Sequence, residues 1–86
     1  MTLRIERVSE ARLVTLRLSG RLQSENLEEL KGHIEGLAPK VVLDLEEIKL
    51  VDWEAVCFLA MCEANGIQLS KCSPYVREWI NREKTS

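Results

Sequence analysis

The sequence has little of what several classes of protein require, since it contains one histidine, two prolines and four glycines. The glycines are isolated, so the chain lacks the glycine-rich loop that holds phosphates in a P-loop nucleotide site. The longest apolar run, residues 55–62, is far shorter than the roughly 20 residues that span a bilayer. Residues 1–10 lack the apolar core of a signal peptide. We therefore expect a cytoplasmic protein without direct membrane insertion.

Residues that could carry catalysis or bind a metal are equally scarce. The single histidine, His33, has no nucleophile or base at the spacing of a local catalytic signature. The three cysteines, Cys57, Cys62 and Cys72, are odd in number and lack a secretory context, so we expect reduced thiols. A zinc site needs four ligands, and His33 has no partner at ligand spacing. The sequence predicts no enzyme, no metal site and no cofactor.

Charge and composition exclude one further class of partner. The net charge is −2 and the basic residues are scattered, so no electrostatic footprint for nucleic acid is present. The composition, 45% hydrophobic and 30% charged, is that of a globular domain. We expect a single domain over residues 1–86, with a core at about residues 3–82 and a frayed tail at 83–86.

The hydrophobic pattern predicts the order β-β-α-β-α-β-α. The expected strands are 3–8, 13–19, 40–45 and 67–72. The first expected helix begins at Ser24, the second runs from 53 to 64, and the third begins at Ser73. The first two strands predict an antiparallel hairpin with one solvated face, and the third predicts a central strand. Two strand-helix-strand units imply parallel neighbours. The fold class is therefore α/β, with a small mixed four-stranded sheet and helices.

The connections between these elements carry weaker signals. Gly36 and Pro39 are expected to close the first helix, and Asn65 with Gly66 the second. The charged residues 46–47 indicate a loop, followed by a connection to residue 52. The helix at 53–64 is apolar nearly all round, so it is either enclosed by the sheet and a neighbouring helix or presents a strip to a second copy in a homodimer.

Two acids and a tryptophan stand at the start of that helix, in "VDWEAVCFLAMC". Asp52 suits the N-cap position, and Glu54 suits the positive end of the helix dipole. These roles leave Trp53 unexplained. Its indole either folds back on Ile48 or Leu50, or remains exposed as part of a binding surface.

Asp44 interrupts the most apolar strand near its carboxyl end, where ligands of α/β sheets bind. The favoured interpretation is structural, with the carboxylate accepting hydrogen bonds from loop amides. The alternative is a ligand pocket bordered by Asp44, Asp52 and Cys57.

In order and spacing, these segments resemble a STAS domain, the fold of bacterial anti-sigma factor antagonists. The resemblance rests on a hairpin ending in "LSGRL", on "KVVLDLEEIKLVD" leading into an apolar helix, and on a last helix that begins with Ser-Pro. It covers about residues 3–82. The resemblance implies a bacterial protein-protein interaction module in regulation or signalling, with an anti-sigma factor, a kinase-like protein or a transporter component as its partner.

The resemblance also shows where this sequence departs from the family. In such antagonists the second Asp is followed by two hydroxyl residues and a Gly, and a kinase-like anti-sigma factor phosphorylates the second hydroxyl. Here Asp52 keeps the Asp, Trp53 and Glu54 replace the two hydroxyl residues, and Ala55 replaces the Gly. Because Glu54 has no hydroxyl, the usual switch is absent. Either its fixed charge mimics the phosphorylated state, or the switch has been lost.

A further departure is Gln23, which stands where these antagonists often have an Asp, and the closing elements after the last helix are missing. The sequence thus predicts a non-catalytic interaction module that is not phosphorylatable at Glu54. The expected partner-binding surface comprises Gln23, Asp52, Trp53, Glu54 and Ala55. The alternatives are a soluble STAS subunit of a membrane transporter, or a STAS domain that senses nucleotides or small ligands.

Overall fold

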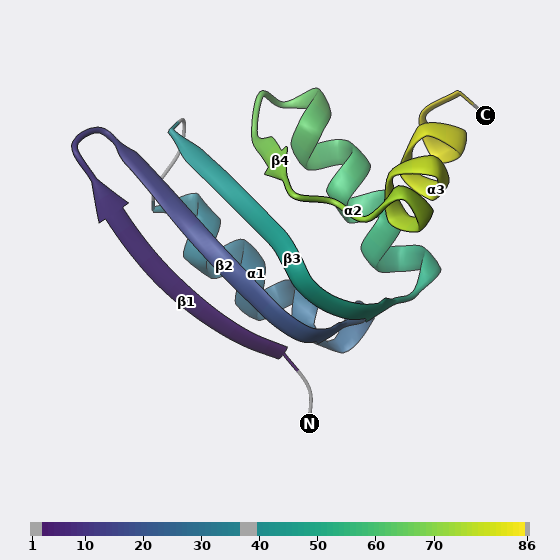
Figure 1. Ribbon diagram of the computed structural model, residues 1–86, viewed down its shortest axis with the longest axis horizontal. Helices are drawn as coiled ribbons and strands as arrows, with labels where there is room; N and C mark the ends of the chain where they lie inside the picture. Colours follow the sequence, from purple (N-terminus) through teal and green to yellow (C-terminus); the bar gives the residue numbers. More distant parts are fainter. Residues whose placement is uncertain (1–2, 37–39, 86) are drawn as a thin grey trace.

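The computed structural model describes residues 3–36 and 40–85, which form one four-stranded sheet with helices (Figure 1). In chain order the elements are β1 (Leu3–Glu10), β2 (Leu13–Leu22), a 3-10 turn (Ser24–Asn26), α1 (Leu27–Glu35), β3 (Val41–Val51), α2 (Trp53–Ala64), β4 (Gln68–Ser70) and α3 (Pro74–Thr85). The sheet order is β1-β2-β3-β4, with β1 antiparallel to β2 and the other two pairings parallel. The predicted α/β class, mixed sheet and element order are confirmed.

β3 is longer than the sequence predicts, because residues 46–51 continue the strand instead of forming a connection. Its register against β2 shifts twice, once between Arg17 and Ser19 and once between Gly20 and Arg21, and each shift inserts one extra residue in β3. Gly20 has a φ of 97° at the second shift, a conformation that favours glycine. The interpretation of residues 46–47 as a loop is wrong, because both belong to β3. The bulges break the two-residue alternation by which a strand is identified in a sequence.

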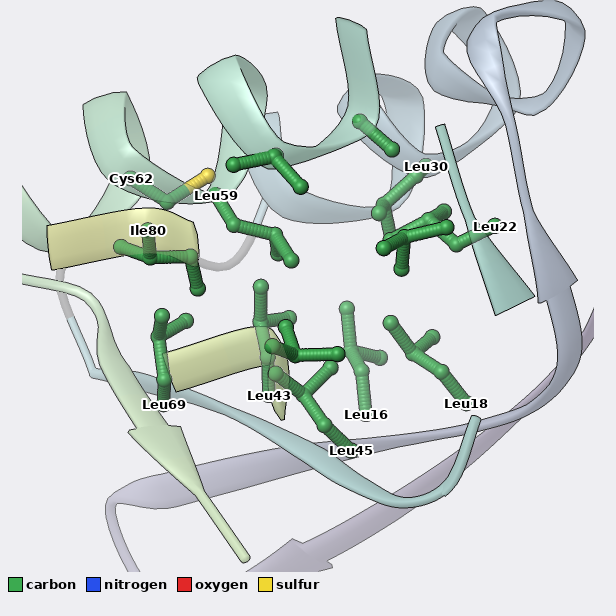
Figure 2. Packing of buried hydrophobic residues seen from close by; sticks show 14 of the residues in the cluster. Leu16, Leu18, Leu22, Leu30, Leu43, Leu45, Leu59, Cys62, Leu69 and Ile80 are labelled. Carbon is green, nitrogen blue, oxygen red and sulfur yellow. The ribbon is translucent and has the colours of Figure 1, made fainter. Parts of the chain in front are cut away.

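The core lies on one face of the sheet. Strand leucines such as Leu16, Leu18 and Leu43 point toward buried side chains of the helices, including Leu59 (Figure 2). Each helix contributes several buried residues to the core, among them Leu30 from α1, Leu59 from α2 and Ile80 from α3. At roughly 25 cal/mol per Å² of apolar area, this burial is the main source of stability.

The opposite face of the sheet carries Arg17, Val42 and Asp44, none of which belongs to this core. Val42 and Asp44 are nevertheless buried. In the strand register Asp44 lies between Arg17 of β2 and Ser70 of β4, so neighbouring side chains surround it. The burial of five successive residues, 41–45, thus does not need a helix layer on each face.

The helix ends follow local signals in most places. α2 begins and ends as predicted, with Asn65 as its C-cap and Gly66 at a φ of 93°. α1 begins three residues later than expected because a 3-10 turn precedes it. Its last residue before the cap is Glu35, while the predicted stop at Pro39 lies outside the described residues.

α3 begins as the sequence predicts. The backbone N–H of Val76 donates to the Ser73 hydroxyl oxygen at 3.3 Å, which is the expected N-cap interaction. At its other end α3 continues to Thr85, so the helix includes residues 83–85 of the expected tail. In the described part of the chain, no helix is long and apolar enough to cross a membrane.

Candidate functional site

Asp52 joins two segments that are distant in sequence. Its Oδ1 accepts a hydrogen bond from the Ala55 backbone N–H at 2.9 Å, which confirms the predicted N-cap of α2. Its Oδ2 accepts from the backbone N–H of Ser24, also at 2.9 Å and 28 positions earlier in the chain. One carboxylate therefore connects the start of α2 to the segment that follows β2.

Gln23 lies in that connected segment, so the fold brings it near Asp52. The Gln23 backbone N–H donates to Oδ1 of Asn26 at 3.0 Å, and the Asn26 N–H donates to the Gln23 carbonyl oxygen at 2.8 Å. Asn26 is buried, and this pair fixes the turn before α1. The sequence interpretation missed Asn26. Its signal in the sequence is an amide side chain three residues after Gln23, which is the spacing of a capping box.

Trp53 remains outside the core. Its side chain is 59% exposed, while Ile48 packs against the core cluster. Of the two interpretations left open by the sequence, exposure at a surface is the one the structure favours. A large aromatic residue held at the first turn of a helix offers contact area at a small cost in side-chain entropy.

Glu54 is exposed beside Trp53 and makes no hydrogen bond or ion pair with any described residue. As the acid in the first turn of α2, it interacts favourably with the helix dipole. Its neighbour Ala55 is fully buried, so the expectation that Ala55 contributes to a binding surface is wrong. The methyl group of Ala55 belongs to the core face of α2.

A groove of about 430 Å³ runs between α1 and α2 and begins at Trp53. Its lining is mainly apolar: Leu27, Ile34, Trp53, Cys57, Phe58, Met61, Cys62 and Ile67, with the polar residues Lys31, Glu35, Glu54 and Asn65. Met61 is 63% exposed. The apolar circumference of α2 is thus divided between the core on one side and this open groove on another.

Asp44 does not line this groove, although Cys57 does. The carboxylate of Asp44 points to the opposite face of the sheet, where its Oδ1 accepts from the Glu46 N–H at 3.0 Å. Its Oδ2 lies 3.9 Å from Nε of Arg17. Asp44 thus accepts a backbone hydrogen bond, as the structural interpretation expects, although the donor belongs to β3 and not to a loop.

The three cysteines are free thiols. Desolvation raises the pKa of Cys62 to about 11. Desolvation, followed by the carboxylates of Glu83 and Glu54, raises the pKa of Cys57. Desolvation also raises the pKa of Cys72, so all three favour the protonated form, which is a poor nucleophile. Among residues 3–36 and 40–85, no group of three His, Cys, Asp or Glu residues is placed to hold a metal ion.

The other end of α2 carries an ion-pair cluster that the sequence interpretation missed. Glu63 accepts hydrogen bonds from both terminal nitrogens of Arg77, at 2.9 and 3.1 Å, and from Nζ of Lys84 at 2.6 Å. These hydrogen bonds lower the pKa of Glu63 from 4.5 to about 2. The cluster ties α2 to α3. Its signal in the sequence is two bases seven residues apart on one face of the last helix.

No protein-family model matches the chain, and a search of curated proteins finds no match either. The family resemblance of the sequence therefore stays a prediction.

Proposed function

We propose that this chain is a STAS-like module that binds a protein partner through the start of α2, without turnover and without a phosphorylation switch. The observation that carries the proposal is Trp53, which is 59% exposed beside Glu54, an exposed carboxylate that has no ion pair with any described residue. Aromatic residues of this kind supply much of the binding energy of protein interfaces. The surface comprises Gln23, Trp53 and Glu54, with Asp52 holding their segments together.

Two features support the assignment to this family. The order β-β-α-β-α-β-α with a mixed four-stranded sheet agrees with the arrangement that the resemblance implies. Asp52 also stands at the junction between β3 and α2, where the family places its second Asp. The partner is then a bacterial regulatory protein, such as an anti-sigma factor or kinase-like protein, or a component of a membrane transporter.

Glu54 makes the charge of this surface constant. A phosphoserine carries about 1.5 to 2 negative charges at neutral pH, and its formation can be reversed, whereas a glutamate carries about one permanently. The partner therefore meets the same acidic surface at all times. Control of the interaction would come from the amount or state of the partner.

The groove is poorly suited to nucleotides, the alternative ligand. Its polar rim holds one base, Lys31, and two acids, Glu35 and Glu54. Phosphate groups need several cationic or backbone N–H donors, and the excess of carboxylates opposes them. A thermal-shift screen with nucleotides is expected to give no stabilisation.

Affinity capture from the source cells tests the proposal with four baits: the wild type, Trp53→Ala, Glu54→Ser and Tyr75→Ala. Tyr75 is the matched control because it is an aromatic residue on α3 with 64% exposure, similar to Trp53. We expect Trp53→Ala to lose a partner that the wild type and Tyr75→Ala both recover. Equal recovery by all four baits would refute the proposed surface.

A further inference from the structure

The open groove beside Trp53 has apolar side chains from both α1 and α2 along its walls. On α2, Trp53, Cys57 and Met61 follow one another at four-residue spacing and all line the groove. On α1, Leu27 and Ile34 form the opposite wall. Side chains at such spacing form one stripe on each helix, so the groove has two continuous apolar walls.

The length of the groove defines the size of an occupant. Its lining along α2 extends from Trp53 to the C-cap residue Asn65, which at 1.5 Å per residue is about 18 Å, or a little over three helical turns. The two walls run side by side, since Leu27 of α1 lies near the start of α2 through the link from Ser24 to Asp52. An elongated apolar groove between two helices suits an amphipathic helix.

The rim charges define the chemistry of that occupant. Glu35 and Glu54 have no ion pair with any described residue, whereas the single base, Lys31, lies 3.9 Å from Glu28 of its own helix. Free carboxylates at both ends favour lysine or arginine on the incoming element. The exposed face of Trp53 beside Glu54 adds a cation–π site for such a side chain.

We propose that the groove seats a basic amphipathic helix of about three turns from the protein partner. Apolar side chains spaced i, i+3 or i+4, and i+7 enter between α1 and α2, and basic side chains meet Glu35 and Glu54. This inference rests on the proposed function, because it names the element by which the partner binds. It extends the binding surface from the start of α2 along most of that helix.

Two synthetic peptides of about 12 residues test the groove directly. One carries leucine at the groove positions and lysine elsewhere, and the other carries glutamate in place of lysine. Binding of each is measured by fluorescence anisotropy against the wild type, Trp53→Ala, Met61→Asp and the control Tyr75→Ala. We expect the leucine-lysine peptide to bind the wild type at least about tenfold more tightly than the leucine-glutamate peptide.

Met61→Asp separates docking from general attraction between opposite charges. An additional acid strengthens non-specific binding of a basic peptide, but it weakens seating in an apolar groove by about tenfold or more. Met61 is exposed, so we expect the variant to fold, and Met61→Gln provides a second substitution if circular dichroism shows that it does not. Equal or tighter binding to the Met61 variant, or no binding of the basic peptide at about 1 mM, would overturn the proposal.

The same variant distinguishes this inference from the proposed function. If a Met61→Asp bait still captures the partner that Trp53→Ala loses, the surface at the start of α2 stands and the groove proposal is wrong. If neither variant affects capture, the proposed function itself is wrong. Peptide binding that does not depend on peptide charge would exclude a basic partner helix and leave a small molecule as the candidate occupant. A molecular mass that rises with protein concentration would indicate a second copy of the chain in the groove, which also excludes the partner helix.

Discussion

The two ends of α2 use acidic residues in opposite ways. At the C-terminal end, Glu63 is enclosed by Arg77 and Lys84 of α3, and its charge is satisfied within the chain. At the N-terminal end, Glu54 is exposed next to an exposed Trp53 and forms no ion pair within residues 3–36 and 40–85. The C-terminal end of α2 is therefore paired with another part of the chain, and we call it the closed end. The N-terminal end is exposed, and we call it the open end.

This contrast shows which acids explain the fold and which require another explanation. Asp52 and Glu63 each connect α2 to a different part of the chain, so stability accounts for both. The side chains of Glu54 and Trp53 make no such hydrogen bond or ion pair in the part of the chain that the structure describes. Their exposure, with a groove running from the same point, is the reason to assign binding to this end of the helix.

The largest expected effect compares the two sides of α2. Leu59 is fully buried, so Leu59→Ala should lower the free energy of unfolding by about 2 to 5 kcal/mol through lost burial and a cavity. Met61 lies two residues away but is mostly exposed, so Met61→Ala should change it by less than about 0.5 kcal/mol. Urea denaturation of the two variants measures both values. Similar losses would show that the groove side is part of the core.

The next effect concerns the Asp52 carboxylate at the N-terminal end of α2. Asp52→Ala removes acceptors for the N–H groups of Ser24 and Ala55, and we expect a loss of about 1 to 2 kcal/mol in urea denaturation. Asp52→Asn keeps one oxygen acceptor, so it should lose less. A change below about 0.3 kcal/mol in Asp52→Ala would contradict the structural role of the carboxylate.

A smaller effect is expected at the closed end, and it depends on pH. The pKa of Glu63 is lowered from 4.5 to about 2 in the folded chain, so its ionisation stabilises the fold above pH 4.5. That contribution is lost as the pH falls from 4.5 toward 2. Glu63→Gln should cost about 1 kcal/mol at neutral pH, and the difference from the wild type should vanish near pH 2. A difference that is independent of pH would contradict the assignment.

Glu54→Gln, at the N-terminal end of α2, is the matched control for Glu63→Gln. Its effect on the free energy of unfolding should be the smallest of the four. Glu54→Gln removes only a favourable interaction with the helix dipole, which is worth about 0.3 to 1 kcal/mol at most and is screened by salt. We expect unfolding curves close to the wild type at moderate salt. A loss as large as that of Glu63→Gln would mean that the two ends of α2 are not different in kind.

Much of the fold could be predicted because local signals determined it. Asp52 before an apolar run and Asn65-Gly66 after it defined α2 correctly at both ends. Ser73 before Pro74 defined the start of α3. The later part of β3 could not be predicted, because its two bulges arise from pairing with β2 and remove the alternation that identifies a strand.

The site was predicted less completely, since its features depend on contacts between distant segments. The N-cap role of Asp52 followed from its position, but its second hydrogen bond, to Ser24, requires the folded chain. Ala55 was assigned to the surface by position along the sequence, whereas the phase of the helix turns it into the core. The exposure of Trp53 and the groove beside it depend on how α1 packs, which one sequence does not show.

The most direct test of binding at the open end of α2 combines melting temperature with affinity for the partner that capture recovers. For Trp53→Ala we expect a melting temperature within about 2 °C of the wild type and a Kd at least about tenfold higher, with Tyr75→Ala close to the wild type in both. A Trp53→Ala chain that binds as tightly as the wild type, or that melts more than about 8 °C earlier, would contradict it.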